Sequence, residues 1–137
     1  RRWAFKHPTP ADFFKTMEDA AGKRLDWFFR EWFIENPHFD VGIDTVVQRG
    51  DTVGVRFRNY ARGVLPLHVR FTFSDGSTQN YDYPAEVWST NSLFYLRRYD
   101  FKGKTLTKVE IDPDARVPDT DRTNNVWPKE AAPPPKP

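Results

Sequence analysis

The most constraining feature of this sequence is a strict alternation of apolar and polar residues that begins at Leu65. The apolar positions are Leu65, Leu67, Val69, Phe71 and Phe73. A period of two places side chains alternately on the two faces of a β-strand, so this segment predicts a strand with one buried face. The run Ser74-Asp75-Gly76-Ser77 follows and is typical of a tight hairpin turn. We therefore expect residues 78–83 to return as an antiparallel neighbour.

Similar segments extend the β-pattern over residues 39–128. Strands are predicted at residues 41–47, 52–59, 84–89, 93–98 and 105–111. Turn-forming residues separate them at intervals of roughly 8–12 residues, which is the spacing of an all-β sandwich. The sequence thus predicts an antiparallel sandwich of about seven strands, closed by a loop over residues 113–128.

The beginning of the chain is helical in pattern. Thr9 is a suitable N-cap, Pro10 fits the first helical position, and Asp12 completes a capping box. Gly22 is the residue type that commonly ends a helix in the left-handed conformation. These residues predict a first helix that runs from Pro10 to about residue 21.

A second, strongly aromatic helix is predicted after Gly22. Its apolar residues fall at i, i+3, i+4, i+7 and i+8, which places them on one face. Asn36-Pro37 should end it, because a residue before proline avoids helical geometry. Two short helices cannot bury this many rings against each other, so we expect a partner surface from the rest of the chain or from another domain. The residues of that face are Leu25, Phe28, Phe29, Trp32 and Phe33.

These elements predict an α+β fold, with an N-terminal helical hairpin followed by an antiparallel β-sandwich. We assign residues 1–38 to the helical part, 39–128 to the sandwich and 129–137 to a disordered proline-rich tail. The absence of cysteine excludes disulfides and thiol nucleophiles. The net charge is only +2 and the basic residues are scattered, so we expect no nucleic-acid binding. No apolar run reaches the ~18 residues of a membrane span.

Three histidines are the only imidazole ligands that the chain offers to a metal. His7, His38 and His68 lie about thirty residues apart, whereas a zinc site needs three ligands held close together. His7 and His38 adjoin prolines and are expected in loops, and His68 is expected to face solvent from its strand. We therefore predict no catalytic, cofactor-binding or metal-binding residue in this chain.

An oxygen-rich segment near the end of the sandwich has two interpretations. Calcium binds six to eight oxygen ligands, which side chains of this kind supply. Asp and Asn are also the standard residues of tight turns, and the segment lacks the glycine and the bidentate glutamate of an EF-hand loop. Turns are the favoured interpretation, and a calcium site is the alternative. The residues concerned are Asp112, Asp114, Asp119, Asp121, Asn124 and Asn125.

Aromatic residues make up 16% of the chain, and many lie on predicted strands. Alternating aromatic residues commonly fill a sandwich core, whereas exposed rings can bind sugar or extended peptide. Core filling is the favoured interpretation, with Tyr95 expected on the outer face. The residues are Tyr81, Tyr83, Trp88, Phe94, Tyr95 and Tyr99.

The helical part resembles a known family. Residues 8–13 read Pro-Thr-Pro-Ala-Asp-Phe, and residues 25–32 read Leu-Asp-Trp-Phe-Phe-Arg-Glu-Trp. This pair is similar to the end of the catalytic domain in aminopeptidase-N-like zinc metallopeptidases of the gluzincin group. A β-sandwich of immunoglobulin-like or fibronectin-like appearance follows in that family, and residues 119–127 resemble the sandwich of bacterial members. The resemblance covers residues 3–127.

The resemblance implies a parent enzyme that binds zinc through His-Glu-x-x-His and a downstream Glu and that cleaves peptide bonds. Neither His-Glu-x-x-His nor the Gly-x-Met-x-Asn substrate motif occurs here, so zinc is expected in a catalytic domain N-terminal to this chain. That domain is the expected partner. The resemblance gives this chain an accessory role, which includes positioning peptide substrate, and it leaves the compartment open, export to the periplasm or cell envelope included.

The alternative is a free-standing sandwich module that binds a protein or a carbohydrate. The aromatic helices distinguish the two hypotheses. A free module should cover those rings itself, whereas an accessory region separated from its catalytic domain should leave an apolar patch.

Overall fold

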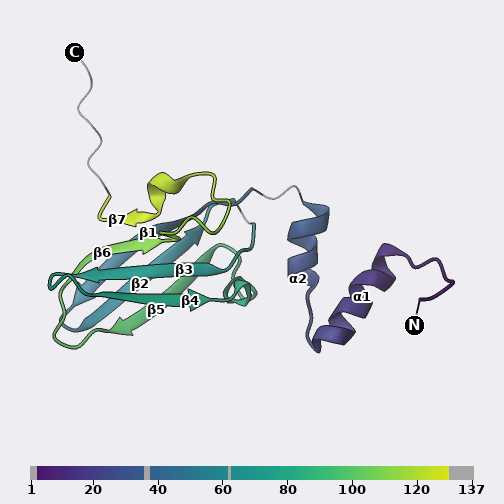
Figure 1. The fold of residues 1–137 in the computed structure, drawn as a ribbon, viewed down its shortest axis with the longest axis horizontal. Coiled ribbons are helices and arrows are strands. Elements are labelled where there is room, and N and C mark those ends of the chain that lie inside the picture. Colours follow the sequence, from purple (N-terminus) through teal and green to yellow (C-terminus); the bar gives the residue numbers. More distant parts are fainter. Residues whose placement is uncertain (1–2, 36–37, 62, 130–137) are drawn as a thin grey trace, which may run out of the picture. The chain divides into compact units, whose positions relative to one another are not determined.

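A computed structural model describes residues 3–35, 38–61 and 63–129 of the 137-residue chain. The chain divides into two compact units, Arg1–Asn36 and Pro37–Pro137. The first unit is helical and the second holds two antiparallel sheets in a sandwich-like arrangement, so the architecture is α+β (Figure 1). The predicted helix end at residues 36–37 and the predicted tail over residues 130–137 lie outside the described residues. No described helix is long and apolar enough to cross a membrane.

The first helix, α1, spans Pro10–Ala21 and begins and ends as predicted. The Asp12 N–H donates to Thr9 Oγ1 at 3.3 Å, and the Thr9 N–H donates to Asp12 Oδ2 at 3.0 Å. This reciprocal capping box satisfies two backbone donors at the helix start. Gly22 ends the helix with a φ of 66°, and its N–H donates to the Glu18 carbonyl at 2.9 Å.

The second helical element departs from the regular helix that the sequence predicts. The α-helix α2 spans only Asp26–Phe29, and a π-helical turn, η1, continues over Arg30–Ile34. A π-turn is wider than an α-turn, so it rotates later side chains away from the face set by the earlier ones. Phe29 is accordingly buried at 6% exposure, whereas Trp32 and Phe33 are 37% and 61% exposed.

Ring contacts join the two helical elements of the first unit. Phe14 of α1 stacks on Phe29 with ring centroids 4.6 Å apart, and it meets Phe33 edge-on at 5.4 Å. The Leu25 N–H also donates to Glu18 Oε1 at 2.7 Å, which ties the connection between the helices back to α1.

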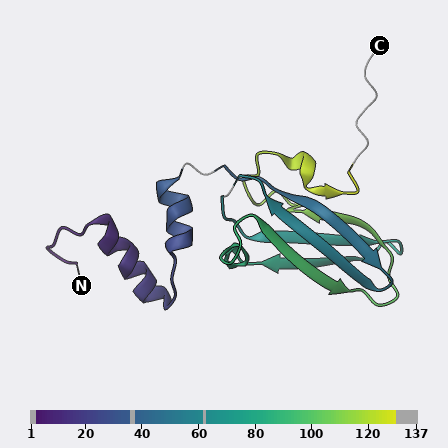
Figure 2. The same ribbon diagram turned by 180° about the vertical axis from the view of Figure 1, so that it is seen from behind.

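Seven strands form the two sheets of the second unit. One sheet has the order β1-β2-β5 and the other β4-β3-β6-β7. The two sheets lie one over the other, and Figure 2 shows the three-stranded sheet from its outer side. The strands are β1 Val41–Arg49, β2 Thr52–Asn59, β3 Leu67–Phe73, β4 Thr78–Tyr83, β5 Phe94–Asp100, β6 Leu106–Ile111 and β7 Val126–Trp127.

The core lies between the sheets and follows the predicted alternation. β2 and β3 alternate strictly between buried apolar residues and more exposed ones. Burial of a side chain of this size contributes about 1.5–3 kcal/mol, so these positions dominate the stability of the sandwich. The apolar residues of these two strands and β6 that are at most 4% exposed are Val53, Val55, Phe57, Leu67, Val69, Phe71, Phe73, Val109 and Ile111, and the polar Asn59 of β2 is buried as well.

One predicted strand is wrong. Residues 84–89 include a 3-10 helix, η2, at Ala85–Trp88. Pro84 precedes it and has no N–H to donate to a sheet. The Trp88 side chain is 1% exposed, and its Nε1–H donates to the Leu65 carbonyl at 3.0 Å. The buried Trp88 side chain therefore holds this segment in place, and the segment does not pair as a strand.

The predicted closing loop contains a strand that the sequence does not reveal. β7 covers two residues and pairs antiparallel with β6, with Val109 opposite Trp127 and Glu110 opposite Val126. Two residues are too few to show a period, which explains why this strand was missed.

Candidate functional site

The three histidines lie in different surroundings. His7 and His38 are exposed, and His68 lies on β3 with 19% of its side chain exposed. The prediction that His68 faces solvent is therefore only partly confirmed. Its Nδ1 shares a hydrogen bond with Asp82 Oδ1 on the neighbouring strand β4. That hydrogen bond lowers the pKa of Asp82 below its ordinary value.

The oxygen-rich segment is built from turns in which carboxylates accept backbone hydrogen bonds. Asp112 Oδ1 and Oδ2 accept from the N–H groups of Arg116 and Val117 at 2.8 and 3.1 Å. Asp119 accepts from the N–H of Asp121 at 3.0 Å, and Asp121 accepts from the N–H two residues further on. The hydrogen bonds of Asp119 and Asp121, each to the N–H two residues on, are those of Asx-turns.

The segment also touches the start of β1. Asn124 Nδ2 donates to Asp40 Oδ1 at 2.7 Å. Burial raises the pKa of Asp40, and the carboxylates of Asp119 and Asp121 raise it further, although the hydrogen bond from Asn124 opposes them. The arrangement is a partly buried acidic end of the sandwich.

The residues present do not fit the zinc site that the family resemblance implies for a parent enzyme. Over residues 3–35, 38–61 and 63–129, no three His, Asp or Glu side chains come together as a group that could hold a metal ion.

The strand aromatics form a cluster between the sheets. The Phe71 ring lies 4.5 Å from Tyr99 and 5.7 Å from Tyr81, measured between ring centroids. Tyr95, expected on the outer face, lies instead on the inner face of β5, where its ring meets those of Phe57 and Trp88. Tyr95 is four residues from the buried Tyr99 on the same strand, so the two side chains point to the same, inner face of the sheet.

The outer face of the three-stranded sheet carries a cationic groove, which we call the arginine groove. It encloses about 650 Å³. The register places Gly54 of β2 between Val47 of β1 and Arg98 of β5, and it places Arg56 beside Leu96. The lining residues are Thr45, Val47, Arg49, Thr52, Gly54, Arg56, Leu96 and Arg98.

The arginine groove continues as an arginine–aromatic ladder. The Arg58 guanidinium lies over the rings of Tyr60 and Phe94, with Cζ 4.8 and 5.5 Å from their centroids. Arg56 also lies over Phe94 at 5.5 Å, and its Nε donates to Asp44. Burial acts to raise the pKa of Asp44, but hydrogen bonds from Thr45 and Arg56 outweigh it and hold that pKa below its ordinary value.

Sequence reasoning missed this groove because the basic residues that form it look scattered. Arg56 and Arg58 alternate along one strand, and Arg98 lies forty residues later. The pairing of β2 with β5 joins strands that are not consecutive in the chain, so the sequence alone does not place these guanidinium groups side by side. The alternation of Arg56 and Arg58, with Gly54 in the same phase, was the available indication.

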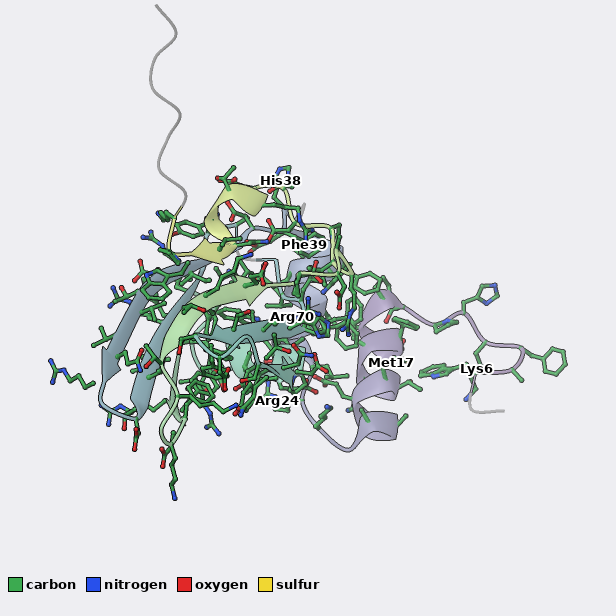
Figure 3. The ribbon with its side chains drawn as sticks, turned by 60° about the vertical axis from the view of Figure 1, so that its left-hand side comes forward. Lys6, Met17, Arg24, His38, Phe39 and Arg70 are labelled. Carbon is green, nitrogen blue, oxygen red and sulfur yellow. The ribbon has the colours of Figure 1, made fainter. Side chains whose placement is uncertain are left out.

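A second candidate surface lies on the helical unit, and we call it the helical apolar face. It is defined by large apolar side chains that keep 37–73% of their surface exposed. Figure 3 labels Met17 on α1. The residues are Phe13, Met17, Trp32, Phe33 and Ile34.

Comparison with known proteins adds no family. No family model matches the chain, and no curated protein matches it significantly.

Proposed function

We propose that this chain is the C-terminal accessory region of a zinc-dependent peptidase of the aminopeptidase-N-like kind, and that it contributes no catalytic residue. In this proposal the helices complete the wall of the catalytic domain. The sandwich acts as an accessory domain that supports the enzyme and positions peptide substrate. The zinc and the catalytic residues belong to the domain N-terminal to this chain.

The observation that carries the proposal is the helical apolar face. Phe33 and Ile34 are 61% and 73% exposed, and Phe13 and Met17 are 47% and 44% exposed. Large apolar surfaces of this kind in a water-soluble protein mark sites of interaction. Transfer of such a side chain from water into a well-packed interface contributes about 1.5–3 kcal/mol, so coverage by a partner is strongly favoured.

The detailed fold supports the same family. The capped helix α1, the aromatic helix α2 and their Phe14–Phe29 stacking are consistent with the helical hairpin that the family places at the end of its catalytic domain. The strand orders β1-β2-β5 and β4-β3-β6-β7 are those expected of a fibronectin-like sandwich, which we propose for the second unit.

The alternative function is a free-standing binding module. Within the helical unit taken by itself, Phe29 is the only described residue that is buried. The resemblance of residues 8–13 and 25–32 to the family favours the accessory role.

The test is the natural reading frame that encodes this segment, together with the activity of its product. We expect His-Glu-x-x-His and a Glu roughly twenty residues later on the N-terminal side, and zinc-dependent cleavage of peptides by the complete product. The present chain alone should cleave nothing. A frame without these ligands, or zinc-dependent cleavage by the present chain, contradicts the proposal.

A further inference from the structure

The arginine groove is centred on a glycine whose position has no structural cause. Gly54 lies in the middle of β2, the central strand of the three-stranded sheet. Glycine inside a strand weakens it, and it usually marks a bulge, a sharp bend or the close approach of another molecule. The single irregularity of the β1–β2 pairing lies between Ile43 and Thr45, away from this residue.

The space above Gly54 is open. A Cβ atom built on this residue would come no closer than 3.9 Å to any atom, and its nearest neighbour would be the Val47 carbonyl oxygen. Its φ lies outside the left-handed region, so any residue can adopt this backbone. Neither packing nor a positive φ demands glycine here, and the open space allows the backbone of a ligand to approach closely.

The charged residues that line this hollow are Arg49, Arg56 and Arg98, although the Asp44 carboxylate binds Arg56 and Asp100 shares the face of Arg98 on β5. Arg49, Arg58 and Arg98 form no ion pair with any carboxylate of the described residues, and Arg56 is bound to Asp44 but still half exposed. Guanidinium groups bind carboxylates through two parallel hydrogen bonds, and several around one hollow strengthen that preference.

We propose that the arginine groove binds an acidic, extended peptide segment whose backbone passes over Gly54. Carboxylates of the segment pair with Arg98, Arg49 and Arg58, and an apolar side chain between them packs on Val47 and Leu96. This inference concerns the sandwich alone and does not rest on the proposed enzymatic parent.

The spacing of the arginines fits an extended peptide. Arg98 lies opposite Gly54, and Arg58 is four residues from Gly54 on β2, so their attachment points are offset by about 13 Å along the strand direction. Side chains of an extended ligand at positions i and i+4 have the same spacing, so two carboxylates of an alternating segment can meet both guanidinium groups.

The apolar part of the groove favours peptide over single-stranded nucleic acid. Bases bind proteins by stacking on open aromatic rings. Here the Phe94 and Tyr60 rings already carry guanidinium groups on their faces. The free apolar surface is aliphatic, with Leu96 at 61% and Val47 at 45% exposure, and aliphatic side chains pack well on other apolar side chains.

The experiment measures binding of a fluorescent peptide of alternating Glu and Val to the full chain by anisotropy, at low and at moderate salt. A peptide of alternating Gln and Val and a single-stranded oligothymidylate serve as competing probes. We expect the acidic peptide to bind, to weaken as salt is raised, and to bind at least about tenfold more tightly than either competitor, since charge complementarity drives the contact. Equal binding of the Gln peptide, tighter binding of the oligonucleotide, or no binding at all overturns the proposal.

Two variants and one matched control locate the site. Arg98→Glu should weaken the acidic peptide at least about tenfold, because it places a repulsive charge in the groove. Arg97→Glu changes the net charge equally on the same strand, but Arg97 belongs to the opposite face, opposite Val55 in the register, and should leave affinity within about twofold. Gly54→Val fills the hollow without altering charge and should also weaken binding. An equal loss of peptide affinity in Arg97→Glu and Arg98→Glu would contradict the proposed binding site. Unchanged affinity in a folded Gly54→Val variant would contradict it as well.

Discussion

The Tyr83 hydroxyl donates a hydrogen bond of 2.9 Å to the Tyr99 hydroxyl, and this bond joins β4 of one sheet to β5 of the other. Both strands lie at the edges of their sheets, so the two phenols tie together edges that no backbone pairing connects. Burial raises the pKa of Tyr99 far above its ordinary value, and the hydrogen bond and nearby charge of Tyr83 act in the same direction. The folded sandwich therefore favours the protonated form of Tyr99.

Tyr99→Phe should lower the free energy of unfolding by about 1 kcal/mol, because the half-buried Tyr83 hydroxyl loses its acceptor. The raised pKa also sets a pH dependence. A group whose pKa rises on folding stabilises the protein below its unfolded pKa of about 10, and that contribution is lost as the pH rises above it. Urea unfolding at pH 7 and at pH 11 tests both. The difference in the free energy of unfolding between wild type and Tyr99→Phe should be smaller at pH 11 than at pH 7. Tyr60→Phe, at an exposed tyrosine, should change the free energy of unfolding little at either pH.

Asp112→Ala should destabilise the sandwich strongly. The Asp112 side chain is 1% exposed and accepts from two backbone N–H groups and from Arg122 Nη2 at 3.1 Å. Its loss leaves the two backbone N–H groups without an acceptor, although Arg122 Nη2 keeps the Asp112 carbonyl at 2.6 Å, and the cost is about 3 kcal/mol in the free energy of unfolding. Asp114→Ala is the matched control, since its ion pairs with Arg70 and Arg116 lie at the surface, where solvent screens them and they contribute little. Similar losses in both variants, measured by urea unfolding, would contradict this account.

The two glycines of the three-stranded sheet should respond oppositely to alanine. At Gly42 an added Cβ would lie 2.5 Å from the Asn124 side chain, so Gly42→Ala must displace the turn that holds Asp40. We expect a loss of about 1–3 kcal/mol, as for other overpacked sites. Gly54→Ala has free space and should be neutral or slightly stabilising, because alanine loses less backbone entropy on folding. Thermal unfolding of both variants provides the measurement. An unchanged melting temperature of Gly42→Ala would contradict the close contact between residue 42 and the Asn124 side chain.

Asp40→Asn should raise stability at pH 7. The pKa of Asp40 is raised by burial first and then by Asp119 and Asp121, so its charged form is disfavoured in the folded state. A carboxyl with a raised folded pKa contributes most below its unfolded value of about 3.9 and loses that contribution as the pH rises through the folded pKa. The increase in the free energy of unfolding caused by Asp40→Asn should therefore be present at pH 7 and become smaller as the pH falls toward 3. A gain that persists unchanged at pH 3 would show that charge is not its cause.

The sequence predicted the elements with strong local patterns and missed those fixed by distant partners. Thr9, Asp12 and Gly22 act within one helix, and the observed bounds of α1 follow them. The alternation along β2 and β3 likewise predicted which residues are buried, because the apolar side chains of an alternating strand all lie on the face that packs on the core.

The failures share a physical cause in tertiary contacts. Residues 84–89 have the composition of a strand, but the buried anchor Trp88 fixes them as η2. The aromatic face of the second helix was read from a period of 3.6, which the π-turn η1 breaks. The arginine groove needed the pairing of β2 with β5, and no local pattern encodes the pairing of strands that are not consecutive.

We propose that the helical apolar face is covered by a catalytic domain in the natural protein. Met17 reports on this face directly, because it is the only methionine of the chain and is 44% exposed on α1. The rate at which peroxide converts Met17 to its sulfoxide, followed by mass spectrometry, measures that exposure. We predict rapid oxidation in the present chain and oxidation at least about tenfold slower in the complete natural product, since a covered thioether is protected. Equal rates in the two proteins, slow oxidation already in the present chain, or a natural product with no further domain to cover the face would contradict the account.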